Sequence, residues 1–225
     1  RPDGTWRTWN VISKTNNKAN FHDNPYAIFD KSNVYNTYRW NVFTGDVTFN
    51  LPFNIKAGVR VIGNMRQHDT EQKNNAGSIN FNSYFYTEQG HVSDLTTQGS
   101  LTWSDRFIDD RLSVDAAAFI EQRNYDYKYI YGETNNGLII DNYFNLAAST
   151  GTPSVINYEQ HYKTRSIFGT VTAGFDDTYF IDGSLRNDWD SRLPIKNNSF
   201  LYGGLSASVM LNQLIKGADW LNYWR

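Results

Sequence analysis

Four histidines are the first residues in this chain whose type could bind a metal ion or move a proton. They lie far apart, at the ends of strand-like stretches or in loops, without the short spacing that groups zinc ligands: His22, His68, His91 and His161. The chain has no cysteine, which excludes a thiolate site and a disulfide framework. We therefore expect no metal site and no bound cofactor.

Two neighbouring carboxylates, Asp188 and Asp190, have the spacing at which a pair could share acid and base roles. Arg192 follows two residues later, and a turn-stabilising pair beside such an arginine is the commoner role. The chain also contains no glycine-rich phosphate loop and no Gly-x-Ser-x-Gly nucleophile elbow. The sequence therefore indicates a protein that is not an enzyme.

Aromatic side chains form two clusters that could hold a ligand: Trp6 with Trp9, and the run Tyr84, Phe85 and Tyr86. Flat aromatic faces can stack on sugar rings or grip peptide side chains, so both clusters are candidate contacts for a ligand or for a partner that covers it. Loop packing and membrane-interface girdles use the same residue types. Four other tryptophans, at strand ends, fit such girdles better: Trp103, Trp189, Trp220 and Trp224.

The composition pairs many aromatic residues with a polar average. The 225 residues include 15 Tyr, 14 Phe and 7 Trp, yet the mean hydropathy is −0.60 and the formal net charge is −2. A sheet with one apolar and one hydrated face would have this composition. The charge balance gives no basic stripe, which argues against nucleic acid as a partner. No stretch approaches the roughly 20 apolar residues of a membrane helix, but the strands of a barrel are allowed.

Apolar and polar residues alternate with a period of two along several long stretches. In residues 53–66, Val59 belongs to the apolar parity and Arg60 to the polar parity, and the pattern recurs often enough to predict about seven strands. Alternating tyrosines from Tyr125 to Tyr131 predict that the fourth strand extends beyond the membrane. Strands of ten or more residues exceed the typical five or six. They can cross an apolar band about 25 Å tall.

The predicted connections alternate in length. Turns near Pro52, Asp109 and Asp176 are short. The other connections are long and rich in Asn, Tyr and Gly: 67–90, 124–160 and 187–200. Short turns on one rim and long loops on the other are the plan of outer-membrane barrels. We therefore predict an all-β fold, a transmembrane antiparallel β-barrel segment of about seven long strands plus the start of an eighth.

The stretch "GSLRNDWDSRLPIKNNSFLYGGLSASVML" combines an Arg-Asn-Asp motif, a hairpin rich in Ser and Asn, and a returning strand with alternating serines. It resembles a recurrent segment of the SusC/RagA-like family of TonB-dependent outer-membrane transporters. The resemblance extends through "GLIIDNYFNLAAS" and "TRSIFGTVTAGFDDTYFIDG" and, more weakly, "HDNPYAIFD". Family members carry a plug domain and close a barrel of about 22 strands. The resemblance thus implies that residues 1–225 are an interior part of one barrel domain, with the plug and the remaining strands outside this chain.

The resemblance also implies a function and partners. It points to import of a large nutrient, a glycan or a peptide, across the outer membrane of a Gram-negative bacterium. A TonB complex would energise import through regions outside this chain, a SusD-like surface lipoprotein would cover the ligand, and outer-membrane lipid would surround the wall. The motif residues Arg186, Asn187 and Asp188 are expected to have a structural role, with Asp182 or Asp188 as the partner of Arg186.

Two other classes of protein stay open. A passive or structural outer-membrane barrel would have the same strands without energised transport. A soluble carbohydrate-binding β-sandwich would also alternate apolar and polar residues, because one face of each sheet meets water. An upstream plug segment in the full-length gene would favour active import over a passive barrel, and folding without detergent would favour the sandwich.

Overall fold

The computed structural model describes residues 10–16, 20–79 and 82–211. In chain order the elements are α1 (Pro25–Lys31), β1 (Ser32–Leu51), β2 (Ile55–Asn74), β3 (Tyr84–Phe107), β4 (Leu112–Leu138), the 3₁₀ turn η1 (Leu146–Ala148), β5 (Ser149–Phe175), β6 (Tyr179–Asp190), the 3₁₀ turn η2 (Ile195–Asn197) and β7 (Ser199–Val209). Trp6, Trp9, Trp220, Trp224 and the expected start of an eighth strand lie outside the described residues.

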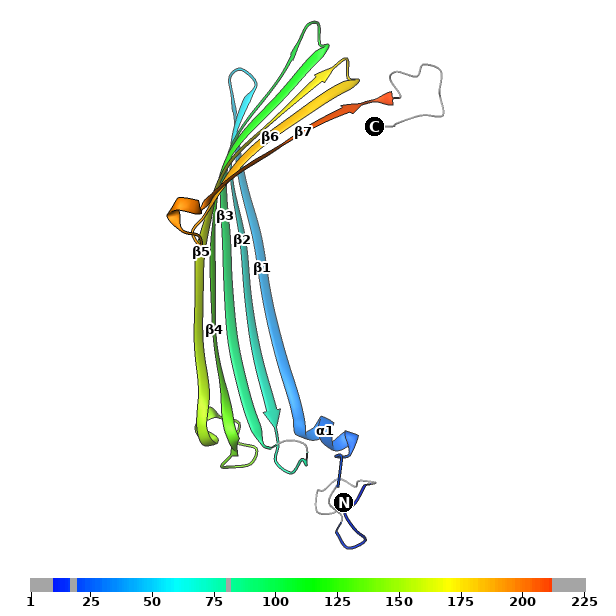
Figure 1. Cartoon of the computed structure of the whole chain (residues 1–225), viewed down its shortest axis with the longest axis vertical. Coiled ribbons are helices and arrows are strands. Elements are labelled where there is room, and N and C mark those ends of the chain that lie inside the picture. The colour runs from blue at the N-terminus through cyan, green and yellow to red at the C-terminus, as the bar shows by residue number, and fades with distance from the viewer. Residues whose placement is uncertain (1–9, 17–19, 80–81, 212–225) are drawn as a thin grey trace. The chain divides into compact units, whose positions relative to one another are not determined.

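Seven strands form one open sheet in which each strand pairs with its neighbours in the sequence (Figure 1). The pairings of β5 with β6 and of β6 with β7 are antiparallel, and β1 and β7 are the edge strands. The predicted all-β fold with seven long strands is confirmed. Within the described part of the chain, no helix is long and apolar enough to cross a bilayer.

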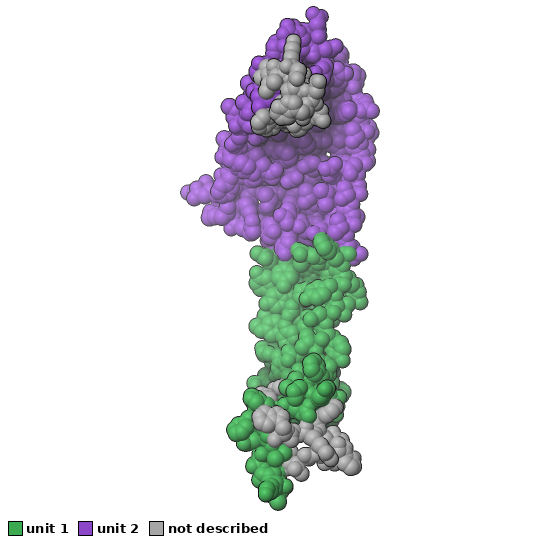
Figure 2. All heavy atoms as spheres, turned by 90° about the vertical axis from the view of Figure 1, so that its right-hand side faces the viewer, with its two compact units in different colours: residues 1–40, 65–92, 127–160 green, residues 41–64, 93–126, 161–225 purple. Residues whose placement is uncertain are grey.

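The chain divides into two compact units, which Figure 2 shows in different colours. Unit 1 comprises residues 1–40, 65–92 and 127–160, and unit 2 comprises residues 41–64, 93–126 and 161–225. Strands β1 to β5 contribute residues to both units, whereas β6 and β7 belong to unit 2 alone. The two units carry different side-chain chemistry.

The strands are longer, and the connections shorter, than the sequence pattern predicts. The expected long segments 67–90, 124–160 and 187–200 shrink to connections over 75–83, 139–148 and 191–198. The period-two rule misses the strand extensions because polar and tyrosine side chains lie on both of their faces, which removes the apolar signal. The expected extension of the fourth strand through Tyr131 is present, since β4 continues to Leu138.

Three tight turns make the remaining hairpin connections, near Pro52, Asp109 and Asp176 as the sequence predicts. Each turn uses left-handed backbone, with φ of 60° at Asn54, 53° at Asp109 and 52° at Asp176. Asn and Asp adopt this conformation more readily than most residues. Two of the turns are also joined, because Arg111 donates from Nε and Nη2 to the Asp176 carboxylate at 2.7 Å each.

The strand register separates two faces of the sheet in unit 2. On β6, Arg186 lies between Phe168 and Tyr202, whereas Leu185 lies between Gly169 and Gly203. Because successive residues of a strand point to opposite faces, one face of β6 is polar and the other apolar. The polar face carries Asp182, Ser184, Arg186 and Asp188, and the apolar face carries Ile181, Leu185 and, from β5, Ile167 and Val171.

Burial is sparse in both units. Unit 1 contains a small hydrophobic core of Phe85, Leu138 and Ala148, with Phe144 and Leu146 packed against it. Both units expose large hydrophobic side chains, and those on the apolar face of unit 2 include Ile120 at 62%, Leu185 at 58% and Ile167 at 56%. Among the described residues no large side chain is fully buried. The apolar face of unit 2 is therefore left uncovered.

Candidate functional site

Two of the four histidines in the described residues each lie beside a carboxylate. His68 Nε2 lies 2.7 Å from Glu88 Oε1, and His161 Nδ1 lies 2.5 Å from Asp126 Oδ1. No group of three or more His, Cys, Asp and Glu side chains that could hold a metal ion is found among the described residues.

Arg186 is the centre of a hydrogen-bonded cluster on the polar face of unit 2. Its Nε donates to Asp188 Oδ1 at 2.8 Å, and its Nη2 donates to Ser166 Oγ at 3.0 Å and lies 3.4 Å from Glu121 Oε1. The guanidinium also lies 4.7 Å from the centre of the Phe168 ring. One side chain of β6 thus contacts β4 and β5 as well as its own strand.

The neighbours of Arg186 extend these contacts to β7. Asp188 accepts a hydrogen bond from Tyr202 Oη at 2.7 Å. Asp182 does not serve Arg186; it accepts from Thr172 at 2.7 Å and from Ser206 at 3.2 Å. On the opposite face, the Asn187 amide exchanges hydrogen bonds with Ser199 at 3.0 and 3.1 Å. Each of the three motif residues is thus bonded within the wall.

Asp188 and Asp190 belong to separate clusters and do not face each other as an acid and base pair. Arg192 donates to Asp190 from Nε at 3.0 Å and from Nη2 at 2.5 Å, and these hydrogen bonds hold the pKa of Asp190 below its ordinary value. The Arg192 guanidinium lies 4.2 Å from the centre of the Tyr162 ring. The arrangement fastens the start of the β6–β7 connection to β5.

Five tyrosines form a continuous aromatic patch in unit 1, here called the tyrosine surface. Its members come from β3, β4 and β5: Tyr86, Tyr127, Tyr129, Tyr131 and Tyr158. The Tyr129 ring stands 5.6 Å from Tyr127, 6.1 Å from Tyr131 and 5.4 Å from Tyr158 between centroids, and Tyr131 lies 5.8 Å from Tyr86. Such spacings are those of interacting aromatic pairs.

Two carboxylates border this surface and are held by tyrosine hydroxyls. Tyr84 Oη donates to Glu133 at 2.7 Å, and Tyr86 Oη donates to Glu88. Burial, followed by the bond to Glu133, raises the pKa of Tyr84, so its hydroxyl stays a donor. The bond from Tyr86, followed by the one from His68, lowers the pKa of Glu88 and favours its ionised form. The surface therefore offers ring faces together with oriented carboxylates.

Phe85 is separated from its two tyrosine neighbours by the alternation of the strand. Its ring belongs to the core with Leu138 and Ala148 and is 7% exposed, and its centroid lies 6.3 Å from that of Phe144 in the 139–148 connection. Tyr84 and Tyr86 are only partly buried. Of the run singled out in the sequence, these two lie on the face that carries the tyrosine surface, and Phe85 lies on the opposite face.

Only part of the tyrosine surface can be recognised from the sequence. The alternation from Tyr125 to Tyr131 marks the β4 tyrosines, and Glu133 and Glu88 lie two residues beyond Tyr131 and Tyr86 on the same strands. Tyr158 comes from β5, so that its place beside them needs the strand register. Trp6 and Trp9, the other aromatic candidates, lie outside the described residues.

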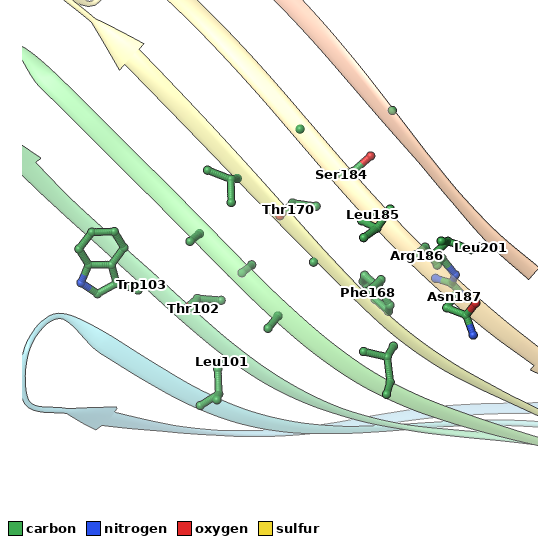
Figure 3. Close-up of a pocket in the computed structure, with 18 of the residues that line it drawn as sticks. Leu101, Thr102, Trp103, Phe168, Thr170, Ser184, Leu185, Arg186, Asn187 and Leu201 are labelled. Carbon is green, nitrogen blue, oxygen red and sulfur yellow. The ribbon is translucent and has the colours of Figure 1, made fainter.

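The apolar face of unit 2 is hollowed. A depression of about 1070 Å³ is lined by side chains of β3 to β7, of which Figure 3 labels Leu101, Trp103, Leu185 and Leu201 among others. Its lining is largely apolar, with Ser184, Arg186 and Asn187 among its polar members.

No protein-family model and no curated protein matches this chain. Solved structures do match its fold. A chain of the RagAB peptide transporter aligns with a TM-score of 0.76 and 16% identity, covering 87% of this chain and 22% of that chain. The RagAB peptide importer aligns in its 'open-open' state with a TM-score of 0.74, 16% identity and coverages of 85% and 21%. In its 'closed-closed' state it aligns with a TM-score of 0.68 and 16% identity, covering 82% of this chain and 21% of that chain.

These matches concern the fold. This chain spans about a fifth of the length of the proteins it matches. Its seven-stranded open sheet has the fold of part of the barrel of such a transporter. The likeness to the RagAB structures bears out, at the level of fold, the resemblance to SusC/RagA-like transporters.

Proposed function

We propose that this chain is a section of the barrel wall of a TonB-dependent outer-membrane transporter that imports a large nutrient and does not act as an enzyme. Residues 1–225 belong in this proposal to one barrel domain. Closure of the barrel requires further strands beyond β1 and β7, because a membrane leaves no sheet edge unpaired. The likeness in fold to the RagAB transporter and the two chemically distinct faces of unit 2 support the proposal.

The observation that carries the proposal is the uncovered apolar face of unit 2. On β5 this face runs from Phe175 through Val171 and Ile167 and then changes to Arg165, which lies opposite Trp189. From Phe175 to Ile167 the apolar run is about eight residues at about 3.3 Å each, and a strand tilt of about 40° reduces it to about 20 Å in height. Counted to Arg165 at its edge the height is about 25 Å, which is that of the apolar band on outer-membrane barrels. An exposed apolar area of this extent calls for a lipid or protein cover.

The same argument disfavours a soluble sandwich. A sandwich buries its apolar face against a second sheet, whereas the seven strands described here form one sheet and leave Leu185 and Ile167 more than half exposed. A passive barrel fits the geometry equally well and is separated from an active transporter by experiment.

The nutrient in this proposal meets the tyrosine surface of unit 1. Ring faces with bordering carboxylates suit either a sugar or a peptide, because both present flat or apolar groups next to hydrogen-bond donors. We favour a peptide, since the structures that share the fold are peptide transporters. A SusD-like lipoprotein would cover the bound ligand, and the TonB complex would act on regions outside this chain.

Uptake by cells that produce the full-length protein tests the proposal. Active import requires uptake of a labelled peptide mixture that stops when TonB is deleted or when a protonophore collapses the energy supply. A passive barrel would keep transporting under both conditions.

Ligand binding by the purified full-length protein tests the site. Tyr129→Ala should weaken peptide binding about two- to tenfold, because an aromatic contact is worth about 0.5–1.5 kcal/mol beyond its buried area. Tyr143→Ala is the matched control, since Tyr143 is an exposed tyrosine of the 139–148 connection outside the tyrosine surface. Equal effects of the two substitutions would refute the assignment of the site.

A further inference from the structure

A second hollow in unit 2 lies where the apolar face changes to polar side chains. It has a volume of about 780 Å³, and its lining includes Ile120, Gln122, Arg165, Ile167 and Trp189. The register places Arg165 opposite Trp189, two residues beyond Ile167 on β5. Because Phe119 stacks on Phe168 of the polar face, with centroids 4.6 Å apart, Ile120 lies on the apolar face beside these residues.

The two halves of this hollow have different chemistry. One half is aliphatic, with Ile120 and Ile167 both more than half exposed. The other half has a cation, an amide and an indole. Glu121 also belongs to the lining, but its carboxylate accepts hydrogen bonds from Gln98 and Arg186. Arg165 Nε donates to Gln122 Oε1 at 3.1 Å, which orients the guanidinium. In the described residues of unit 2, the salt bridges give Arg165 no carboxylate partner, whereas Arg186 has two and Arg192 has one.

We propose that this hollow binds the phosphate-bearing headgroup of a membrane lipid, with Arg165 as the phosphate ligand and an acyl chain along Ile120 and Ile167. The inference rests on the proposed function, which places the apolar face in the outer membrane. Arg forms planar, two-pronged hydrogen bonds with phosphate, and a Trp at the edge of an apolar band sits at headgroup level. A hollow that is apolar on one side and cationic on the other is complementary to an anionic lipid.

Native mass spectrometry of the full-length protein in non-ionic detergent provides the test. The probes are monophosphoryl lipid A, the same lipid without its phosphate, and inorganic phosphate alone. The wild-type protein should retain the phosphorylated lipid in preference to the other two. Arg165→Gln should weaken that retention about fivefold, the effect of about 1 kcal/mol per basic residue near an anionic lipid surface.

Arg192→Gln is the matched control, because Arg192 is an arginine of the same unit that already pairs with Asp190 and lies over Tyr162. It should leave lipid retention unchanged, and Arg165→Lys, which keeps the charge, should retain more lipid than Arg165→Gln. Heat-modifiable mobility on gels reports whether each variant folds.

Three results would overturn the inference: equal retention by Arg165→Gln and wild type, equal retention of both lipids, or inorganic phosphate bound as well as the lipid. Membrane fractionation is scored separately. If the protein is in the outer membrane but shows no lipid preference, only this inference fails. If it is not in a membrane, the proposed function fails as well.

Discussion

Substitution by arginine should have different effects at two adjacent residues of β5, because these residues lie on opposite faces of the sheet. Val171 lies on the apolar face and is 51% exposed, about midway between Phe175 and Arg165. Thr170 lies opposite Ser184 on the polar face. An arginine at Val171 would meet lipid near the bilayer midplane, whereas an arginine at Thr170 would meet the hydrated interior.

The expected cost follows from this position. A lipid-facing arginine near the midplane of a barrel costs about 2–4 kcal/mol. Each 1.4 kcal/mol is a factor of ten in an equilibrium constant, so Val171→Arg should shift the folding equilibrium about 30-fold or more. Thr170→Arg removes no lipid contact and should stay within about 1 kcal/mol of the wild type.

Urea titration of the full-length protein in lipid vesicles, followed by heat-modifiable mobility on gels, measures the difference. Val171→Arg should reduce the folded fraction at each urea concentration, and Thr170→Arg should follow the wild-type curve. If Val171→Arg fails to assemble at all, Val171→Asn and Thr170→Asn provide a milder pair. Equal losses at the two positions, or a greater loss at Thr170, would refute the assignment of the faces.

Three further outcomes are expected. In intact cells a thiol reagent that does not cross the membrane should label Asn135→Cys but not Asp109→Cys, because the proposed barrel would have its tight turns on the periplasmic side; the opposite pattern would invert the topology. Arg186→Ala should lower the amount of folded barrel, at a cost of about 1–2 kcal/mol for charge-assisted hydrogen bonds lost at Asp188, whereas normal folding with weakened ligand binding would assign Arg186 to the binding site. Arg192 lowers the pKa of Asp190, so the carboxylate stabilises the fold above its ordinary pKa of about 3.9 and loses this effect as the pH falls through the lowered value. The difference in Tm between Asp190→Asn and wild type should therefore be present at pH 7, begin to shrink near pH 3.9, and vanish only once the pH is below the lowered pKa of Asp190; a difference that does not shrink as the pH falls below about 3.9 would mean that the charge of Asp190 is not involved.

The sequence predicts those stretches of strand in which apolar and polar residues alternate, as they would where one face of the sheet meets lipid. Val59, Val171 and Leu185 alternate with polar residues because one face of their strands is apolar. The extensions of β2 to β5 lack that signal, since both of their faces carry polar side chains or tyrosines. Their length therefore emerges only from the strand pairing.

The candidate site shows the same division between local and long-range information. Tyr127, Tyr129 and Tyr131 are recognisable from their spacing, because alternate residues of one strand share a face. The approach of Tyr158 and Tyr86 depends on the register of three strands. The alternation of β3 separates Phe85 from Tyr84 and Tyr86, but the burial of Phe85 depends on the 139–148 connection, which supplies much of the core around it.

Charge balance within the wall bears on which ligands the proposed transporter can take. On the polar face of unit 2, Arg60 pairs with Asp46, Arg123 with Asp94 and Arg186 with Asp188. A solute that moved along this face would meet three arginines whose charge is already compensated by a carboxylate close by, which weakens their attraction for an anion.

The tyrosine surface follows the same principle. Its rings are neutral, and the two carboxylates at its border already accept hydrogen bonds from Tyr84 and Tyr86. A cationic ligand would gain at Glu88 or Glu133 only by displacing or sharing a tyrosine hydroxyl, which offsets part of the gain. Recognition would then depend mainly on stacking against rings, a contact that tolerates varied sequences because it requires a flat or apolar face and not a particular charge. This chemistry fits the capture of a mixed pool of large nutrients better than selection of one charged solute.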